Sequence, residues 1–596
     1  IPNLYTIAGE LLPSVIHVSA RCVSTHALNI FGDHSDVMAC RQTGYAMLCS
    51  ANVQEVMDLG AVAHLSTLKS RVPFLHFFDG FRTSHEVQKI ETWDYEDLRS
   101  MVDMDDVQAF RARALNPEKP VLRGSAENSD VFFQHREACN RYYNDAVATT
   151  EMYMNTINEK LGTDYRLFNY YGAPDADRVI VAMGSVCDTI QETVDFLNAR
   201  GEKVGMVKVH LYRPFSAKHL LAALPETVKH ISVLDRTKEP GSLGEPLFLD
   251  VVAALKGSAF NDVPVYGGRF GLGSKDTVPA HIIAVYNNMA APQPKPEFTL
   301  SIEDDVTHLS LPVTENPDTT PAGTTSCKFW GLGSDGTVGA NKDSIKIIGD
   351  NTDMFAQGYF FYDSKKSGGI TVSHLRFGSS PITSTYLINK ANFVACHCPS
   401  YVTKYDMVQD LVPGGTFLLN CIWTPDQLDS QLPASMKRYI AENNIHFYII
   451  NGIKIAEEVG LPGRASTILQ SAFFAISGIL PVEKAIELMK AAVVKKFSKK
   501  GEAVVNANFA GIDRGAQEIV KVDVPDSWKT AEDAPRRLEV PTDRPEMKKF
   551  VKEILDPVGR LHGDDLPVSA FADRADGVYP AGSAAFEKRG IAITVP

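Results

Sequence analysis

The sequence predicts an α/β protein built from several doubly wound, Rossmann-like domains. Its 596 residues are too many for a single hydrophobic core, so about three or four domains are expected. Val72 to Phe78 is a near-continuous apolar run, as expected of a strand in a parallel sheet that is covered on both faces. Arg178 to Met183, Asp188 to Ala199 and Val204 to Leu211 have the patterns of strand, helix and strand, which indicates a βαβ crossover.

Composition excludes several classes of protein. Hydrophobic residues at 44% and charged residues at 22% are ordinary for a globular chain, and a net charge of −13 argues against nucleic-acid binding. No apolar run approaches the length of a membrane span. Nine scattered cysteines without a CxxC pair indicate a reducing compartment, and Cys396-His397-Cys398 is expected to hold buried thiols rather than a metal. The opening Ile1-Pro2-Asn3 is unlike a signal peptide, and we expect the protein's true beginning to lie elsewhere.

The first domain is expected over residues 1–165. It is expected to begin with a strand at Leu12 to Ser19, with Arg21 at its end, followed by helices from Gln42 to about Ala51 and from Val53 to Thr67. The strand at Val72 to Phe78 comes next, and then a helix start at His85 and Glu86 capped by Ser84. An irregular excursion from Leu98 to Tyr142 is expected to wrap the domain, and a helix from about Asp145 to Leu161 closes it.

Three further segments follow. Residues 166–322 hold the crossover, whose helix is closed by Gly201, then a turn at Phe270 to Ser274 with Pro279 after it in place of a helix, and a proline-rich linker over 290–325. Residues 323–534 are expected to alternate strands (Tyr386 to Asn389, Phe393 to Cys396, Gly415 to Asn420, His446 to Asn451) with helices (Gly452 to Val459, Thr467 to Ser477, Pro481 to Phe497, and one containing Asn508). Residues 535–596 are polar, with one helix near Glu546 to Leu555.

Two glycine-rich turns stand about one βαβ unit apart. Gly331 to Thr337 follows a short strand and opens a helix carrying Asn341 and Lys342, and Lys365 to Gly369 follows the strand Gly358 to Tyr362. Glycines after a strand let backbone N–H groups approach a phosphate, and the helix N-terminus favours negative charge. Neither turn has Walker or GxGxxG spacing. On pattern alone, tight βα turns with a solvated lysine pair explain both segments equally well.

Longer strings carry a resemblance. These are GLGSDGTVGANK and SKKSGG in the turns, and IPNLYTIAGELLP, FGDHSDVMACRQTG, HFFDGFRTSHE, YYGAPDADRVIVAMGS, LYRPF, DRTKEPG and FEKRGIAI elsewhere. Together they resemble the pyruvate:ferredoxin (flavodoxin) oxidoreductase family over essentially the whole chain. The resemblance implies a transketolase-like pyrimidine-side domain (1–165), a transketolase C-terminal-like domain (166–322), a coenzyme A-binding domain (323–534) and an extended connector (535–596) to a ferredoxin-like module beyond this sequence.

The resemblance also implies a reaction and its site residues. The family decarboxylates pyruvate oxidatively on thiamine diphosphate with Mg²⁺, passes electrons through iron–sulfur clusters to ferredoxin or flavodoxin, and transfers the acetyl group to coenzyme A. The implied coenzyme A residues are Gly331, Gly333, Ser334, Asp335, Gly336, Thr337, Lys365, Lys366, Ser367 and Asn508. Arg21, ending a Val18-Ser19-Ala20-Arg21 motif, is the implied partner of the pyruvate carboxylate, because its planar fork suits a 2-oxoacid. Ser466 departs from the family's asparagine, at a cost of about one hydrogen bond.

Some expected features are absent from the sequence. It has no Gly-Asp-Gly segment for Mg²⁺ and diphosphate and no CxxCxxC run for a cluster, so these ligands are expected outside this chain, which alone should not turn over. Alternatives remain: a pyruvate:NADP or other 2-oxoacid oxidoreductase, or, from another class, a non-catalytic coenzyme A-binding scaffold subunit. The family implies a homodimer in the cytoplasm or in an organelle matrix (hydrogenosome or mitochondrion).

Overall fold

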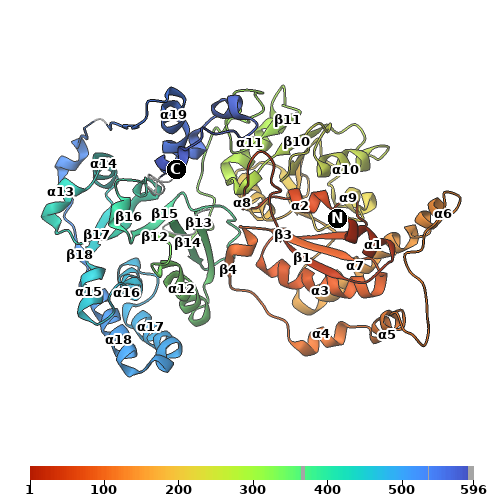
Figure 1. The fold of residues 1–596 in the computed structure, drawn as a ribbon, viewed down its shortest axis with the longest axis horizontal. Coiled ribbons are helices and arrows are strands. Elements are labelled where there is room, and N and C mark those ends of the chain that lie inside the picture. The colour runs from red at the N-terminus through yellow and green to blue at the C-terminus, as the bar shows by residue number, and fades with distance from the viewer. Residues whose placement is uncertain (364–368, 535, 588–596) are drawn as a thin grey trace. The chain divides into compact units, whose positions relative to one another are not determined.

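The chain folds into two compact units. The computed structural model describes residues 1–363, 369–534 and 536–587 (Figure 1). The first unit comprises residues 1–85, 90–319 and 383–386, and the second comprises the described residues of 86–89, 320–382 and 387–587. Each unit contains sheets covered by helices, so the predicted α/β class is confirmed.

The first unit opens with a four-stranded sheet in the order β1-β3-β2-β8. Its strands are β1 (Val15–Ala20), β2 (Ala46–Ser50), β3 (Phe74–Asp79) and β8 (Leu211–Arg213), the first three parallel and β8 antiparallel to β2. The helices of this part are α1 (Pro2–Gly9), α2 (Ser35–Ala39), α3 (Val53–Ser70), α4 (Tyr95–Met101), α5 (Met104–Ala112), α6 (Phe132–Glu137) and α7 (Asn140–Leu161). Because β8 follows residue 165, this sheet joins the two predicted domains 1–165 and 166–322, whose boundary stays a prediction.

The second sheet of this unit has the order β11-β10-β9-β6-β7-β5. Its strands are β5 (Phe168–Gly172), β6 (Arg178–Ala182), β7 (Val204–Val209), β9 (His230–Asp235), β10 (Val265–Arg269) and β11 (Glu297–Thr299), and its helices are α8 (Val186–Ala199), α9 (Ala217–Ala223), α10 (Pro246–Leu255) and α11 (Pro279–Ala290). Strands β6 and β7 are parallel and joined by α8, which confirms the predicted crossover. Gly201 has a φ of +90° just after the end of α8, as its predicted C′ position requires.

The second unit contains one mixed sheet in the order β18-β17-β16-β15-β12-β14-β13-β4. Its strands are β4 (Glu86–Gln88), β12 (Thr325–Leu332), β13 (Phe355–Tyr362), β14 (Ile370–Gly378), β15 (Ala391–Cys396), β16 (Leu411–Asn420), β17 (His446–Ile450) and β18 (Val520–Lys521). Its helices are α12 (Thr337–Asn351), α13 (Leu428–Gln431), α14 (Ala434–Glu442), α15 (Gly452–Glu458), α16 (Ser466–Ser477), α17 (Val482–Phe497), α18 (Glu502–Gln517), α19 (Pro545–Phe550) and α20 (Asp556–Gly559). Strands β12, β15, β16 and β17 are parallel, so their carboxyl ends share one edge of the sheet.

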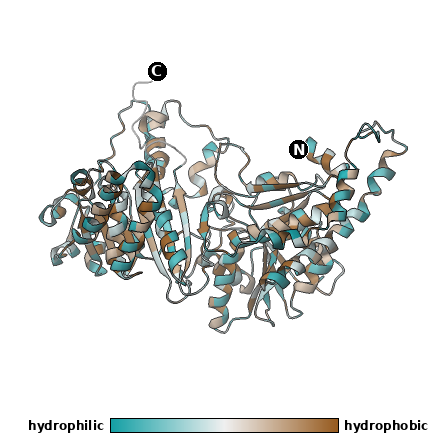
Figure 2. Cartoon of the chain, turned by 90° about the horizontal axis from the view of Figure 1, so that it is seen from below, coloured by the Kyte–Doolittle hydropathy of each residue, from teal (hydrophilic) through white to brown (hydrophobic). Residues whose placement is uncertain are grey.

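The helices are amphipathic covers for these sheets. Figure 2 shows brown and teal stretches alternating along the helices, as expected of amphipathic helices. Among the described residues, no helix combines the length and apolar character needed to cross a bilayer.

Several predicted elements are wrong. The helix expected from Gln42 to about Ala51 is the strand β2, each of whose residues is buried, and a short buried run cannot be told from a helix by periodicity. Glu86 opens the strand β4 rather than a helix, because the Ser84 hydroxyl accepts the Phe81 amide at 3.0 Å instead of capping a following helix. No strand forms at 386–389.

Two other regions also differ from expectation. Pro279 begins the helix α11, where its fixed φ and missing N–H are tolerated at the first helical position. The region from Leu98 to Tyr142, expected to be irregular and to wrap the domain, forms short helices. Every residue from 114 to 138 is exposed, while ion pairs of Lys69 with Asp103 and of Arg123 with Glu10 join the excursion to the rest of the domain.

Candidate functional site

The first glycine-rich turn of the sequence joins β12 to α12. Its geometry requires glycine at Gly336, whose φ is +91°. The Asp335 carboxylate accepts the Leu332 amide at 2.9 Å and the Thr337 amide at 2.8 Å, so it closes the turn from inside. The first helical hydrogen bond runs from the Ala340 amide to the Gly336 carbonyl. The amides of Val338 and Gly339 therefore precede the hydrogen-bonded ladder and are the donors that an anion at this helix end would meet.

A chain of hydrogen bonds fixes the start of α12 against the carboxyl ends of the neighbouring strands. The Thr337 hydroxyl lies 2.7 Å from Nδ1 of His397, just beyond β15. The His397 amide donates to the Trp330 carbonyl at 2.9 Å, and Nδ2 of Asn420 donates to the His397 carbonyl at 2.9 Å. Burial lowers the pKa of His397 to about 4, so its imidazole is neutral near pH 7.

A groove of about 640 Å³ opens beside this turn, a volume within the range of small-molecule sites. It runs from Gly336 along α12 and is bounded by α16 and α17. Apolar side chains line it (Ile347, Leu488, Met489, Ala492, Val493). Exposed lysines stand on its rim (Lys346, Lys495, Lys496), and Asp343 and Asp350 also line it. Two of these lysines also lie in the last turn of α17, where cations stabilise a helix end, and Lys496 pairs with Asp343 at 2.8 Å.

The structure gathers only part of the predicted coenzyme A set at the groove. Gly336 lines it together with Ser466, and a Cβ on Gly336 would lie 2.8 Å from the Ser466 hydroxyl. Gly331 is packed against Thr337 and Asp335, which leaves no room for a side chain there, while the Gly333 amide donates to the Gly369 carbonyl.

Other members of that set lie elsewhere. Ser334 is exposed with a φ of +74°. Asn508 is buried in α18, where its Nδ2 donates to the Val504 carbonyl at 2.8 Å, and it does not line the groove. Lys365, Lys366 and Ser367 lie outside the described residues.

Arg21 follows β1 at the carboxyl edge of the first unit's opening sheet. Its guanidinium lies 4.6 Å from the centre of the Phe81 ring, and its amide donates to the Asp36 carboxylate at 3.0 Å. The side chain is exposed, and over the described part of the chain no carboxylate lies within ion-pair distance of its guanidinium. The alternative to a binding role for Arg21 was a structural salt bridge at the end of the strand. Instead of such a salt bridge, the guanidinium contacts the Phe81 ring.

Several of the resemblance strings meet around Asp79, a buried residue that ends β3. Its carboxylate contacts Nε2 of His34 at 2.5 Å, Nη1 of Arg236 at 2.8 Å and the amide of Ser185 at 2.9 Å. Burial alone would raise the pKa of Asp79, but Arg236 and His34 outweigh it and hold that pKa below its ordinary value. This cluster ties together the ends of β3 and β9 and the starts of α2 and α8.

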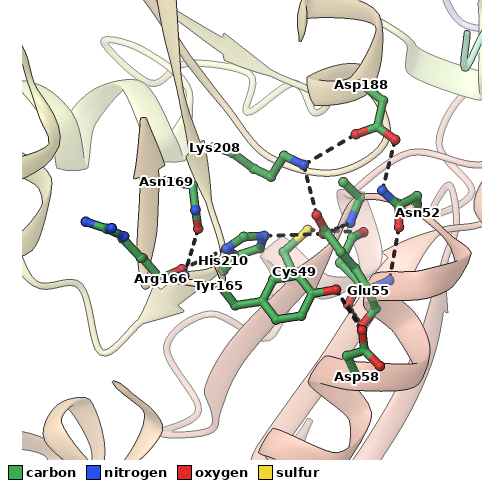
Figure 3. Close-up of polar contacts among 12 residues, drawn as sticks. Cys49, Asn52, Glu55, Asp58, Tyr165, Arg166, Asn169, Asp188, Lys208 and His210 are labelled. Atoms are coloured by element: carbon green, nitrogen blue, oxygen red, sulfur yellow. Dashed lines mark hydrogen bonds and ion pairs between the residues drawn. The ribbon is translucent and has the colours of Figure 1, made fainter. Parts of the chain in front are cut away.

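Sequence reasoning missed a second buried charge cluster in this unit (Figure 3). The Lys208 ammonium, on β7, lies 2.9 Å from the Glu55 carboxylate and 3.3 Å from that of Asp188. Glu55 also accepts the Ala51 amide at 2.6 Å, and its carboxylate lies 3.3 Å from Nε2 of His210. The only signal in the sequence was a lysine inside the apolar strand VGMVKV.

The charges of this cluster are mutually dependent. Burial would raise the pKa of Glu55, but Lys208 and His210 together lower it below its ordinary value. Burial raises the pKa of Asp188 by more than Lys208 lowers it. The two carboxylates in turn raise the pKa of Lys208 although burial opposes this, so the lysine stays charged.

Known proteins match the chain from end to end. Residues 1–155 match the family model for pyruvate flavodoxin/ferredoxin oxidoreductase, thiamine diphosphate-binding, and residues 326–518 match that for pyruvate ferredoxin/flavodoxin oxidoreductase. Residues 176–282 match core domain II of pyruvate:ferredoxin oxidoreductase, and residues 534–592 match a domain of unknown function. The chain belongs to the pyruvate:ferredoxin (flavodoxin) oxidoreductase family.

Relatives with these names align along the whole sequence. The chain is 56% identical to a pyruvate-flavodoxin oxidoreductase of Enterobacter agglomerans and 57% identical to a pyruvate:ferredoxin oxidoreductase of Moorella thermoacetica, covering 100% of this chain and 50% of each relative. It is 47% identical to a mitochondrial pyruvate dehydrogenase [NADP(+)] of Euglena gracilis, covering 100% of this chain and 33% of that protein. The chain thus spans about half the length, or less, of these relatives.

Proposed function

We propose that this chain is part of an enzyme that oxidatively decarboxylates pyruvate to acetyl-coenzyme A and passes the electrons to ferredoxin or flavodoxin. Identities of 56% and 57% along the full chain to enzymes with these names support the proposal. The structural observation that supports a role for this chain in that reaction is the groove that opens at the Gly336 turn.

We propose that this groove and turn bind coenzyme A. The ligand combines phosphate groups with a long uncharged arm, so it needs donors and cations at one place and an apolar channel beside them. The start of α12 offers first-turn amides that have no hydrogen-bond partner among the described residues, at the positive end of a helix dipole. The groove adds the rim lysines Lys346 and Lys495 and an apolar lining. Lys365, Lys366, Ser367 and Asn508 remain proposed members of the site on the resemblance alone.

Arg21 is the proposed partner of the pyruvate carboxylate. It stands at the carboxyl edge of a parallel sheet, where α/β proteins place ligands, and its guanidinium is exposed. Stacking on Phe81 holds the guanidinium plane and leaves its N–H edge to donate two parallel, charge-assisted hydrogen bonds to a carboxylate. Its backbone is fixed by the hydrogen bond from its amide to the Asp36 carboxylate at 3.0 Å.

We propose that this chain supplies only part of the sites of the remaining cofactors, although residues 1–155 match a thiamine diphosphate-binding family model. Among the described residues, no three His, Cys, Asp or Glu side chains are placed to share a metal ion, and the nine cysteines are dispersed. The sequence also lacks Gly-Asp-Gly and clustered cysteine runs. On this basis we propose that the Mg²⁺ of thiamine diphosphate and the iron–sulfur clusters take ligands from outside this chain, and we derive no catalytic step through them.

The acceptor, assembly and compartment are proposals of a coarser kind. The names of the Enterobacter and Moorella relatives favour ferredoxin and flavodoxin as acceptors. The name of the Euglena protein favours NADP and places that protein in a mitochondrion. A homodimer in the cytoplasm or in an organelle matrix fits the family. The rival from another class is a coenzyme A-binding scaffold without turnover.

Titration calorimetry of this chain with coenzyme A tests the binding proposal. We expect binding that weakens with salt, and about tenfold weaker binding when Lys346→Ala and Lys495→Ala are combined, since each removes a cation from the groove rim. A matched double variant, Lys454→Ala with Lys484→Ala, removes two exposed lysines that do not line the groove and should bind as the wild type does. Equal losses in the two pairs would exclude the groove.

A further inference from the structure

We propose that His397 is a positioning residue for the glycine turn that opens α12, acting on the bound ligand through Thr337. The inference rests on the proposed binding of coenzyme A at this turn. His397 does not line the groove, so any effect on binding must pass through the turn. The contact that carries it joins Nδ1 of His397 to the Thr337 hydroxyl, 2.7 Å apart.

Thr337 is the first residue of α12, and it is held from two sides. Its side chain is 1% exposed and packs so closely on Gly331 that a Cβ there would lie 2.6 Å from its hydroxyl oxygen. Its amide donates to the Asp335 carboxylate. The His397 imidazole fixes the remaining freedom of the hydroxyl, and with it the orientation of the first peptide groups of the helix.

His397 is itself anchored through its backbone. Its amide donates to the carbonyl of Trp330 in β12, and its carbonyl accepts Nδ2 of Asn420 at the end of β16. The Asn420 side chain also accepts the Gly452 amide at 3.0 Å, where α15 begins. The imidazole thus ties the start of α12 to three parallel strands of the sheet. Nε2 of His397 is buried and has no hydrogen-bond partner among the described residues, so Nδ1 is the ring atom that does the positioning.

Asparagine and glutamine separate this role from simple packing. The amide group of asparagine reaches the place of Nδ1, whereas that of glutamine reaches the place of Nε2. Asparagine is also the smaller residue, so it leaves more empty space than glutamine does. If His397 only fills volume, His397→Gln should therefore be the milder change; if it positions Thr337, His397→Asn should be milder.

The experiment measures coenzyme A affinity by calorimetry on the wild type, His397→Asn, His397→Gln, Thr337→Ser and Thr337→Val. We expect His397→Asn and Thr337→Ser to stay within about threefold of the wild type, and His397→Gln and Thr337→Val each to weaken binding about tenfold. The double variant of His397→Gln with Thr337→Val should weaken it no further than either alone, because both remove the same bond. Affinity that ranks glutamine above asparagine, or additive losses in the double variant, overturns the inference.

Hydrogen exchange of residues 331–342 in the same variants separates this inference from the ligand proposal. Faster exchange in His397→Gln and Thr337→Val than in His397→Asn, measured without ligand, supports positioning of the turn. Failure of the wild type to bind coenzyme A would refute the ligand proposal alone. Equal exchange in the asparagine and glutamine variants would refute positioning by His397 whether or not the ligand binds.

Discussion

Replacing Lys208 by methionine removes the cation between two buried carboxylates. Lys208 is 12% exposed, and its ammonium lies 2.9 Å from Glu55 and 3.3 Å from Asp188, whose side chains are 6% and 5% exposed. Methionine retains the unbranched apolar stem of lysine, so the change removes the charge with little loss of packing. Among the described residues, the partners that remain for the two carboxylates are neutral donors, such as the Ala51 amide, together with His210 beside Glu55.

The expected cost follows from the balance of hydration and attraction. At an effective dielectric constant of about 20, an ion pair near 3 Å is worth about 5 kcal/mol, and each buried ion loses several kcal/mol of hydration. Attraction and desolvation therefore nearly cancel while the cluster is complete. Removing the cation alone leaves the desolvation of Glu55 and Asp188 uncompensated, so Lys208→Met should lower the unfolding free energy of the first unit by about 3–5 kcal/mol near pH 8.

The deficit should depend on pH with a defined sign. Burial already raises the pKa of Asp188, and loss of Lys208 raises it further. A folded-state pKa above the unfolded value gives stability at low pH that is lost as pH rises through the folded pKa. The deficit of Lys208→Met should therefore shrink from pH 8 to pH 5. Adding Asp188→Asn, which removes one surplus charge, should restore about 1–2 kcal/mol at pH 8.

Urea-dependent hydrogen exchange of peptides from α3 and β7 measures this local stability without requiring the whole chain to unfold in two states. The matched control is Lys203→Met, since Lys203 precedes the same strand and pairs with Asp175 in solvent, where its removal should leave the midpoint unchanged. The reasoning fails if Lys208→Met behaves like the control, or if Asp188→Asn destabilises the Lys208→Met chain further.

Three further outcomes are expected. In the full-length enzyme, Arg21→Leu should lower kcat/KM for pyruvate by about 2–5 kcal/mol of transition-state binding, with partial rescue by Arg21→Lys; a lower Tm with unchanged kcat/KM would make the residue architectural. Burial lowers the pKa of His76 to about 3, so between about pH 6.5 and 3 the unfolded chain binds a proton at this residue and the folded chain does not. The Tm in thermal scans should therefore fall as the pH is lowered through this range, and it should fall less steeply in His76→Gln. Gly336→Ala places a Cβ 2.8 Å from the Ser466 hydroxyl at a φ of +91°, so it should lower the unfolding free energy measured by denaturation by about 1–2 kcal/mol and weaken coenzyme A binding. Unchanged affinity for coenzyme A would show that the turn is not part of the binding site.

The sequence predicted elements well where local signals agreed. The helix α3 begins at Val53 as expected because Asn52 caps it, its side chain accepting the Glu55 amide at 3.0 Å. The crossover through α8 was equally clear, with apolar strands on either side and Gly201 at the close. The strand β2 was missed because AMLCS is buried on every side and has no period that separates strand from helix.

The site was predictable only where one segment carries it. The turn around Gly336 is local, so the sequence identified it as a candidate ligand site, although a plain βα turn fitted its glycines equally well and only the resemblance favoured a ligand. The partner of Thr337 is His397, 60 residues away, and nothing in the string ACHCPS suggests that its imidazole reaches a helix start. Lys208 and Glu55 are 153 residues apart and meet only after the two sheets of the first unit have packed. Such partners depend on tertiary topology, which one-dimensional patterns do not contain.

The structure also explains why one βα turn is a ligand candidate while similar turns are not. The starts of α8 and α10 each receive a buried carboxylate: Asp79 accepts the Ser185 amide, and Asp235 accepts the amides of Leu247 and Phe248. A fully buried carboxylate occupies the anion position of a helix end and excludes an incoming phosphate. At α12 the corresponding Asp335 is only half-buried and accepts the Thr337 amide, while Gly339, two residues further on, lines the groove. An anion can therefore reach this helix start without displacing a buried charge. The amide oxygen of asparagine can still accept a hydrogen bond from one of the two turn amides, so Asp335→Asn should weaken the affinity for coenzyme A less than Gly336→Ala does.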